Sequence, residues 1–275
     1  MKITKADGSK EDFKPAKLRN SLRRAGATAE EVKDIVHHIE SELHEGMKTQ
    51  AIYRHAFELL RGSESTSAAR YSLRRALFGL GPTGFPFEDF LGRLFEHQGY
   101  QTKTRVTLSG ACAEHELDVA AYKDDHSFVA EAKFHARPGI KSDLQVALYS
   151  YARWLDLRDQ KICSADSCGI QEFRLITNTK FTSTARRYGE CVGLKLLSWD
   201  YPKAGNLHDL IASAGIYPVT VMASLSGKQK QSLLGRGVIL CEDIVKKPQV
   251  LRHIHLSKRK FEAVVSEARQ LCDQA

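Results

Sequence analysis

The sequence predicts a multidomain α/β protein. It has a mostly helical first segment, an α/β core with a mixed sheet between helices, and a small all-α C-terminal segment. Two observations support this prediction. Helical periodicity dominates the first and last parts, whereas strand-like and helix-like stretches alternate between them. A cluster of helix-breaking residues, GLGPTGFP, interrupts the pattern at 79–86. We therefore expect domains at residues 1–81, 82–202 and 203–275, which suits a chain of 275 residues.

Composition and charge limit the classes of function. Hydrophobic residues make up 42% of the chain and charged residues 27%, as in ordinary globular proteins, and no apolar run approaches a membrane span. The N-terminus lacks the hydrophobic stretch of a signal peptide, so we expect a cytoplasmic protein. The six scattered cysteines form no CxxC pair, which favours reduced thiols over a zinc ribbon. The net charge of +8 favours a polyanionic partner.

The first segment begins with a short predicted strand at residues 1–5, followed by a turn at Asp7 and Gly8. Thr28 followed by Glu31 matches a capping box, in which the two side chains satisfy amides at the start of a helix. The spacing of hydrophobic residues predicts four helices, at residues 15–25, 29–45, 49–61 and 66–78.

Three stretches of this segment carry a family resemblance: ITKADGSKEDFKPAKLRNSL, GMKTQAIYRHAFELL and AARYSLRRAL. Together they resemble the ATP-cone, the regulatory domain of ribonucleotide reductases and of their zinc-containing repressor. The resemblance implies ATP or dATP as a regulatory ligand, and its cations suit a triphosphate. Ala6 stands where relatives usually have an arginine, so an ATP-cone fold that has lost its ligand and serves for dimerisation is the alternative. The residues implied for the nucleotide are Lys5, Glu11, Lys17, Thr49, Tyr53 and Arg75.

The second segment alternates between the two periodicities. A sheet placed between helices is the natural way to bury strands in this order. The predicted elements are a helix at 86–98, strands at 100–108, 115–123 and 127–135, a helix at 141–157, a strand at 172–178, a helix at 182–191 and a strand at 194–200.

The predicted strand VAEAKFH carries Glu131 and Lys133 two positions apart, so both side chains lie on one face. Asp118 sits among apolar residues on the preceding strand, and a hairpin would bring it beside Glu131. Two adjacent carboxylates repel each other unless a cation lies between them, and oxygen ligands suit Mg²⁺. Lys133 would then lie close to a metal-bound water. From these residues alone, an ion pair on a surface hairpin is an equally good interpretation.

The order of helix, three strands, helix and strand resembles the restriction-endonuclease-like core of the PD-(D/E)xK nuclease superfamily. In that superfamily the aspartate lies on the second strand and E-x-K on the third, as Asp118, Glu131 and Lys133 do. The resemblance implies Mg²⁺-dependent hydrolysis of a nucleic-acid phosphodiester that leaves a 5′-phosphate and a 3′-hydroxyl. Asp118, Glu131 and the carbonyl of Ala132 would hold the metal, and Lys133 would orient the attacking water.

Further residues match the same superfamily. Glu88 lies on the first helix of the core, where relatives often carry an acidic residue that reaches the metal; a carboxylate favoured by the helix N-terminus is the alternative. Gln145 and Tyr149 share a helical face and resemble the Q-x-x-x-Y signature of the Mrr-like and RecB-like branches. In those branches the pair either supports the active-site lysine or contacts nucleic acid, and the first of these implies a catalytic role for Gln145. For Tyr149, a position in the hydrophobic core is the alternative. Glu116 shares the strand face of Asp118, either as an extra ligand or as a solvated side chain.

The third segment is basic and predicted to be helical. Residues 225–275 contain ten Lys or Arg and five Asp or Glu. The stretch SLSGKQKQSLLGRGVILCEDIVKK resembles a helix-hairpin-helix, in which Gly235 and Gly237 permit a tight turn whose amides meet a phosphate. Such contacts position a protein on DNA without reading sequence. A helical module for protein contacts is the alternative. The cations around the turn are Lys228, Lys230, Arg236, Lys246 and Lys247.

These observations lead us to expect a nucleotide-regulated, Mg²⁺-dependent endodeoxyribonuclease whose partners are DNA and an adenine nucleotide. A role in restriction or defence is what the combination implies. Because ATP-cones commonly associate and a double-strand cut needs two active sites, we also expect a homo-oligomer. The alternative is a nucleotide-responsive DNA-binding regulator with an inactive nuclease core. The intact set of Asp118, Glu131 and Lys133 argues against it.

Overall fold

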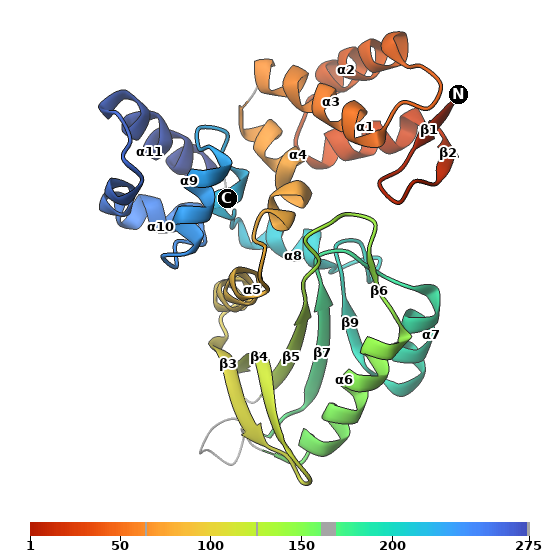
Figure 1. The fold of residues 1–275 in the computed structure, drawn as a ribbon, viewed down its shortest axis with the longest axis vertical. Coiled ribbons are helices and arrows are strands. Elements are labelled where there is room, and N and C mark those ends of the chain that lie inside the picture. Colours follow the sequence, from red (N-terminus) through yellow and green to blue (C-terminus); the bar gives the residue numbers. More distant parts are fainter. Residues whose placement is uncertain (64, 125, 161–168, 274–275) are drawn as a thin grey trace.

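The structure, a computed structural model, describes residues 1–63, 65–124, 126–160 and 169–273. Figure 1 shows three lobes, which follow the three segments of the sequence. The first lobe, red to orange, and the third lobe, blue, lie side by side above the second lobe, a sheet covered by helices. Helix α4 lies between the first and third lobes and leads down to the second.

The first lobe contains an antiparallel hairpin and four helices, which confirms the helices predicted from sequence. Leu22, Ile39 and Leu60 are fully buried in its core. Thr28 and Glu31 form the expected capping box at the start of the second helix. The elements are β1 (Lys2–Thr4), β2 (Lys10–Asp12), α1 (Pro15–Arg24), α2 (Ala29–Glu42), α3 (Thr49–Ser63) and α4 (Ser65–Phe78).

A five-stranded mixed sheet forms the centre of the second lobe, in the order β3-β4-β5-β7-β9. The first three strands run antiparallel to one another, whereas β7 and β9 run parallel to β5. Parallel neighbours need a crossover connection, which helices α6 and α7 provide. The strands are β3 (Gln101–Ser109), β4 (Glu114–Lys123), β5 (His126–Lys133), β7 (Glu172–Thr177) and β9 (Lys195–Leu197).

Helices cover both faces of this sheet. Because side chains alternate along a strand, Phe128 of β5 packs in the cluster that contains α5, and Val129 packs in the cluster that contains α6 and α7. A short parallel pair, β6 with β8, lies beside the main sheet. The helices and the short strands are α5 (Phe85–His97), β6 (Lys141–Ser142), α6 (Leu144–Leu157), β8 (Lys180–Phe181) and α7 (Ser183–Val192).

The third lobe shares its core with the rest of the molecule. Leu73 and Leu77 of α4, together with Leu80, belong to the same hydrophobic cluster as α5 and the C-terminal helices. The Thr220 hydroxyl donates to the Ala76 carbonyl at 2.7 Å, which ties the third lobe to the end of α4. The third segment of the chain contains α8 (Leu207–Ala214), which lies next to the second lobe below α4 in Figure 1, the 3-10 helix η1 (Val219–Val221), α9 (Gly227–Leu234), α10 (Cys241–Lys246), the 3-10 helix η2 (Pro248–Ile254) and α11 (Lys258–Asp273).

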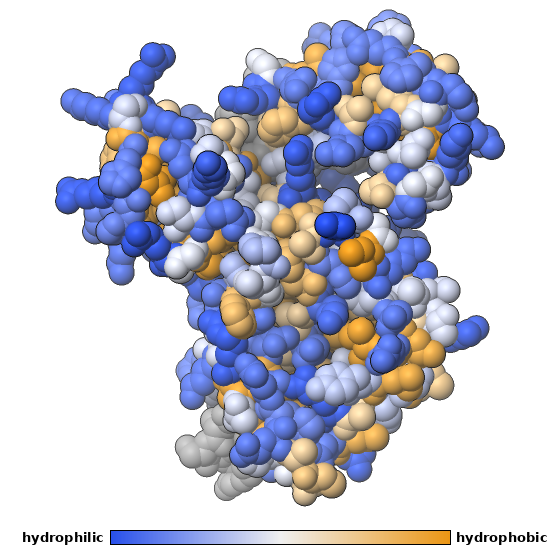
Figure 2. Space-filling view, in the orientation of Figure 1, coloured by the Kyte–Doolittle hydropathy of each residue, from blue (hydrophilic) through white to orange (hydrophobic). Residues whose placement is uncertain are grey.

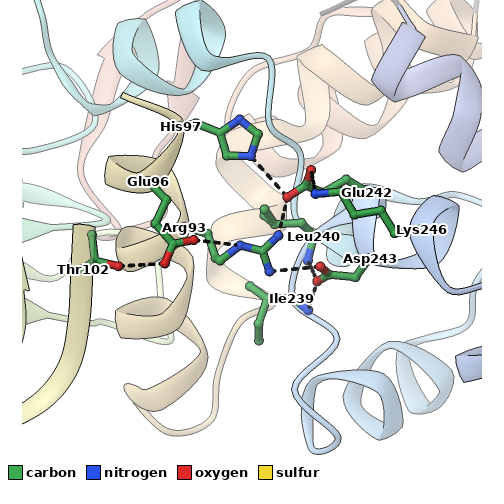
Figure 3. A network of polar contacts seen from close by, with 9 residues as sticks. All are labelled: Arg93, Glu96, His97, Thr102, Ile239, Leu240, Glu242, Asp243 and Lys246. Atoms are coloured by element: carbon green, nitrogen blue, oxygen red, sulfur yellow. Dashed lines mark hydrogen bonds and ion pairs between the residues drawn. The ribbon is translucent and has the colours of Figure 1, made fainter. Parts of the chain in front are cut away.

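A polar cluster around Arg93 joins the second lobe to the third (Figure 3). The guanidinium of Arg93, on α5, donates to Asp243 at 2.9 Å and to Glu242, both on α10. Glu242 also pairs with Lys246 at 2.7 Å and contacts His97 at 3.2 Å. Burial raises the pKa of Glu242, but the hydrogen bonds from Lys246 and His97 and the charge of Arg93 outweigh it and lower the pKa to about 2.

The loop that follows β5 reaches the first lobe. Gly139 in this loop has a φ of 95°, a value that residues with a Cβ rarely adopt. It lies against Asp7 in the turn between β1 and β2. A Cβ at position 139 would lie 3.3 Å from the Asp7 amide nitrogen. Asp7 in turn accepts hydrogen bonds from the amide and the hydroxyl of Ser9. The turn of the first lobe therefore contacts the loop that begins directly after the Glu131–Lys133 segment.

Polar residues cover most of the face that Figure 2 shows. Hydrophobic residues gather in the region where α6 and α7 lie in Figure 1. Two leucines of α6, Leu148 and Leu155, are exposed. Within the part of the chain that the structure describes, no helix combines the length and the apolar character needed to cross a bilayer.

Candidate functional site

Asp118 and Glu131 lie side by side at the point where β4 and β5 diverge. The register pairs Val119 with Ala130, so Asp118 and Glu131 are the next residues along the two strands. One Asp118 oxygen accepts a hydrogen bond from the Ala132 amide at 2.6 Å. The predicted hairpin is therefore present, and it brings the two carboxylates together.

A cavity of about 320 Å³ lies over these carboxylates. It is strongly acidic, because side chains from α5 and β4 also face it. Glu88, expected at the site, and Glu116, whose role the sequence left open, both contribute to its wall. The complete lining is Phe85, Glu88, Glu114, His115, Glu116, Asp118, Glu131, Tyr149 and Arg153.

The electrostatics of the cavity favour a cation. Burial and the neighbouring Glu131 carboxylate raise the pKa of Asp118 to about 7, while the Ala132 amide acts in the opposite direction. Burial also raises the pKa of Glu88, although Arg105 lies 3.2 Å from its carboxylate. Crowded carboxylates shift in this way when nearby positive charge does not fully compensate them. The site therefore has a donor set and a charge that suit a divalent ion.

Arg153 on α6 is a residue of this site that the sequence analysis missed. Its buried guanidinium pairs with Glu131 and donates to the carbonyl of Glu116. The Arg153 Nε atom is buried and has no hydrogen-bond partner among the described residues. The ring of Tyr149 lies 5.4 Å from its guanidinium carbon. A signal was present, because Arg153 continues the helical face of Gln145 and Tyr149 by one more turn.

A second arginine reaches the site from β3. The ladder of β3 and β4 pairs Thr104 with Val119 and Val106 with Leu117 but skips Arg105, whose φ of 54° interrupts the regular strand. Its guanidinium contacts the start of α5, where it donates to Asp89 at 2.7 Å and to Glu88 at 3.2 Å. Arg105 thereby fixes the position of Glu88 in the wall of the cavity.

Lys133 and Gln145, for which catalytic roles were expected, lie outside the lining of the cavity. Lys133 is the exposed last residue of β5, two positions after Glu131. Gln145 is exposed in the first turn of α6. Tyr149 lines the cavity and is 59% exposed, so the core position that was its alternative is wrong.

The three expected metal ligands do not form a closed cage. Among the described residues, one set of three His, Cys, Asp or Glu donor atoms lies within 4.8 Å, and it does not include Glu88, Asp118 or Glu131. Mg²⁺ is usually held by one or two carboxylates, and waters and substrate phosphates complete its octahedron. Asp118 and Glu131 supply that number of carboxylates.

The expected nucleotide residues form two groups in the first lobe. In the first group, the Glu11 carboxylate lies 2.9 Å from the Lys17 ammonium and 4.0 Å from that of Lys5. The hydrogen bond from Lys17 lowers the pKa of Glu11. Thr49 begins α3, close to the end of β1, because the Thr4 amide donates to the Met47 carbonyl at 3.0 Å.

Tyr53 and Arg75 form the second group. The ring of Tyr53 on α3 stacks on Tyr71 of α4 with centroids 4.9 Å apart, and the Arg75 guanidinium lies 6.0 Å from it. Burial raises the pKa of Tyr53, and its hydroxyl has no hydrogen-bond partner among the described residues. A buried hydroxyl without a partner is unfavourable, so a ligand that bonds to it would be stabilised.

The turn between α9 and α10 differs from the expected phosphate-binding hairpin. The amides of Gly235, Arg236 and Gly237 donate to carbonyls of α9 at 2.9–3.0 Å, so they are not free for a phosphate. Lys230 is half-buried and donates to the Thr220 carbonyl at 2.8 Å. The expectation that the amides of this turn contact a phosphate is therefore wrong. Lys228, Arg236 and Lys247 are exposed around the turn, and so is Lys246, although it pairs with Glu242.

Comparisons with known proteins identify two parts of the chain. The model of the ATP cone domain matches residues 1–77, which confirms the predicted ATP-cone, and the model described as AF1548-like, C-terminal matches residues 217–272. ATP-cone domains bind nucleotides such as ATP or dATP as regulators.

Two relatives extend the match. An Archaeoglobus fulgidus protein described as uncharacterized is 36% identical over 182 residues, which cover 66% of this chain and 99% of that protein. A solved structure titled "Crystal Structure of Protein of Unknown Function AF1548" is 34% identical with a TM-score of 0.55, and the match covers 70% of this chain and 100% of that one. The chain therefore belongs to the AF1548-like family and carries an ATP-cone domain at its N-terminal end.

Proposed function

We propose that this protein is a nucleotide-regulated, Mg²⁺-dependent endodeoxyribonuclease that hydrolyses DNA phosphodiester bonds. The observation that carries the proposal is the crowding of Asp118 and Glu131 in one acidic cavity with Glu88. Because the pKa of Asp118 is raised to about 7, a divalent cation would relieve repulsion that the arginines of the site leave in place. Bound Mg²⁺ would polarise the scissile phosphate and favour deprotonation of a water.

The residues of the chain supply the other parts of the proposed reaction. Asp118, Glu131 and the carbonyl of Ala132 would hold the ion. Lys133, on the same strand face as Glu131, orients the attacking water and stabilises the charge that develops on the phosphate. Arg153 pairs with Glu131, and its guanidinium would be available as a donor to a phosphate oxygen where that carboxylate binds a metal ion.

Side chains around the cavity suit a nucleic acid. Phe85 and Tyr149 line it and are 56% and 59% exposed, so their rings offer stacking faces for bases. Gln145 lies one helical turn before Tyr149 and is placed to support Lys133. The net charge of +8 and the exposed cations of the third lobe favour DNA, and a restriction or defence role follows from such a nuclease. A homo-oligomer is part of the proposal, because cutting both strands needs two active sites.

The nucleotide is proposed to act on this site from the ATP-cone domain. Lys5 and Glu11 flank the turn that contains Asp7, and this turn contacts Gly139. The loop of Gly139 connects the strand of Glu131 to the short strand β6, which directly precedes helix α6. A triphosphate bound at the turn would therefore change the position of the loop and, through it, β5 and α6, two of the elements that line the cavity.

Cleavage of supercoiled plasmid tests the proposal. The wild type is incubated with Mg²⁺, with and without ATP or dATP, on methylated and unmethylated plasmid. Glu131→Ala and Lys133→Ala are expected to lower the rate by about 100-fold or more, because each removes a proposed reacting group. Glu262→Ala, which removes an exposed carboxylate on α11, serves as the control and is expected to cut normally. Cleavage that persists in both site variants would contradict the assignment.

A nucleotide-responsive DNA-binding regulator with an inactive core is the second candidate. Two observations favour it: Arg153 neutralises Glu131, and Lys133 lies outside the lining of the cavity. A wild-type protein that never cuts plasmid, but shifts DNA with an affinity that depends on ATP or dATP, would support this second function.

A further inference from the structure

We propose that His38, Glu42 and His55 form a binding site for Zn²⁺ or a similar transition-metal ion in the ATP-cone domain. His38 and Glu42 lie four residues apart on α2, so they share one helical face, and His55 reaches them from α3. One Glu42 oxygen lies 3.3 Å from His38 Nε2, and the other lies 2.9 Å from His55 Nδ1. This is the set of three donors within 4.8 Å that the described part of the chain contains.

The spacing of these atoms suits a tetrahedral ion. Zn²⁺ binds imidazole nitrogen and carboxylate oxygen at about 2.0–2.2 Å, so two ligands of one ion lie roughly 3.3–3.5 Å apart. The observed separations of 2.9 and 3.3 Å are close to this value. The two imidazole rings lie edge to face with centroids 4.9 Å apart, and one nitrogen of each ring lies within 4.8 Å of the other and of a Glu42 oxygen. Three protein ligands leave a fourth position for water.

The ligand types select the class of ion. Imidazole nitrogen favours zinc, copper, nickel and iron, whereas Mg²⁺ and Ca²⁺ favour oxygen ligands. The proposed site is thus chemically distinct from the acidic cavity of the second lobe. Glu42 is the last residue of α2, where the partial negative charge of the helix C-terminus favours a cation.

The three side chains are accessible to solvent, and few other cations compete for the Glu42 carboxylate. The side chains of His38, Glu42 and His55 are 46%, 47% and 25% exposed, so an ion can enter without unfolding. Within the described residues, the salt bridges of Glu42 are to these two imidazoles, and no lysine or arginine pairs with it. The ion would link α2 to α3, the helix that carries Thr49 and Tyr53.

Titration of the full chain with Co²⁺ in reducing buffer tests the proposal, because Co²⁺ reports its ligands by its visible spectrum. We expect one equivalent to bind with weak bands typical of nitrogen and oxygen ligands. His38→Ala, Glu42→Gln and His55→Ala are each expected to weaken binding about tenfold or more. His37→Ala, on the same helix outside the set, and Asp118→Asn, in the acidic cavity, are expected to bind as the wild type does.

A second readout is thermal unfolding with Zn²⁺. Because the ion links two helices of the folded state, it is expected to raise the Tm of the wild type and of His37→Ala, but not of His55→Ala. Three results would overturn the proposal: no saturable binding below millimolar ion, equal affinity in the wild type and the three ligand variants, or an intense thiolate band that identifies cysteine ligands.

Discussion

The carboxyl of Asp118 is held in a position that opposes its own ionisation. It is largely buried and it faces Glu131 on the next strand, and these two effects outweigh the hydrogen bond from the Ala132 amide, which favours the charged form. Groups with strongly shifted pKa values in a cavity are frequent at functional sites, because the same environment that raises the pKa also strengthens binding of an ion. The proposed metal site and the shifted pKa therefore have one physical origin.

A consequence is that Asp118 makes stability depend on pH. Its pKa rises from 3.8 to about 7 on folding, so between these values the folded state holds a proton that the unfolded state has lost. The stability contributed by this group therefore decreases as pH rises through that window. Without metal, Asp118→Asn is expected to be about 2 kcal/mol more stable than the wild type at pH 8, and nearly equal at pH 4.

Urea unfolding in EDTA at both pH values measures this difference. Asp34→Asn, which changes an exposed carboxylate on α2, is the control and should show no such change with pH. A difference between the wild type and Asp118→Asn that is the same at pH 8 and pH 4 would show that the pKa of Asp118 is not raised.

The hydroxyl of Tyr53 leads to a second prediction. Since it is buried without a partner among the described residues, Tyr53→Phe is expected to leave stability unchanged or to raise it by up to about 1 kcal/mol. The same change is expected to weaken ATP or dATP binding several-fold in calorimetry. Tyr71→Phe is the comparison variant: it removes a hydroxyl that is hydrogen-bonded to Ser21, so it is expected to be less stable than the wild type. Equal losses of stability in both variants would contradict the prediction.

At the scale of helices and strands, most of the second lobe follows from periodicity. The hairpin of β4 and β5 placed Asp118 beside Glu131, because alternation and register determine which residues face each other. The predicted strand at 194–200 ends at Leu197, since Ser198 and Tyr201 close a turn through a 2.7 Å hydrogen bond. Strands β2, β6 and β8 were missed because two or three residues show no period.

The arginines of the site were harder to predict. Arg105 reaches Glu88 through a φ of 54°, and that conformation has no signature in the local sequence. Arg153 lies on the predicted helical face, but its pairing with Glu131 depends on how α6 packs across the sheet. Long side chains reach partners that are far away in sequence, so spacing within one element does not identify them.

The joint between α5 and α10 gives a prediction at this scale. Arg93 pairs with Glu242 and Asp243 at a partly buried position, so Arg93→Ala removes the cation that these two carboxylates share across the joint. We expect a loss of about 2–3 kcal/mol in the free energy of unfolding, measured with urea. Arg252→Ala removes an exposed arginine from the same lobe and is expected to change stability little. Equal stability of the two variants would show that the cluster contributes nothing.

The same cluster makes the stability of the protein decrease in acid. Folding lowers the pKa of Glu242 from 4.5 to about 2, so its stabilisation is present above pH 4.5 and is lost as pH falls toward 2. The wild type should therefore lose more stability than Glu242→Gln across this window in a pH series of thermal unfolding. Parallel curves for the two proteins would contradict the lowered pKa.

At the scale of the whole molecule, the contact of Gly139 with Asp7 connects the nucleotide domain to the proposed active site. Gly139→Val cannot keep both its φ of 95° and its distance from Asp7. On the proposed function, the variant is expected to bind ATP or dATP in calorimetry, but to cleave plasmid at a rate that no longer responds to the nucleotide.

Gly193→Val is the matched control for this experiment. Gly193 also has a positive φ, of 77°, but nothing lies within 4 Å of the position of its Cβ. The control variant shares the backbone strain and keeps the contact between lobes, so its cleavage should still respond to nucleotide. A response that survives in Gly139→Val would exclude this contact as the route.

The core that α4 shares with the C-terminal helices has a consequence for engineering and for gene fusion. A cut at the glycine-rich break near residue 80 looks natural in the sequence, yet it would remove Leu73 and Leu77 from a cluster that belongs to the other two lobes. The remaining fragment would expose to water the apolar side chains that α4 covers, and it is expected to aggregate. A chimera that carries a different regulatory domain should therefore be joined upstream of α4. The second and third lobes then keep this helix in their shared hydrophobic core.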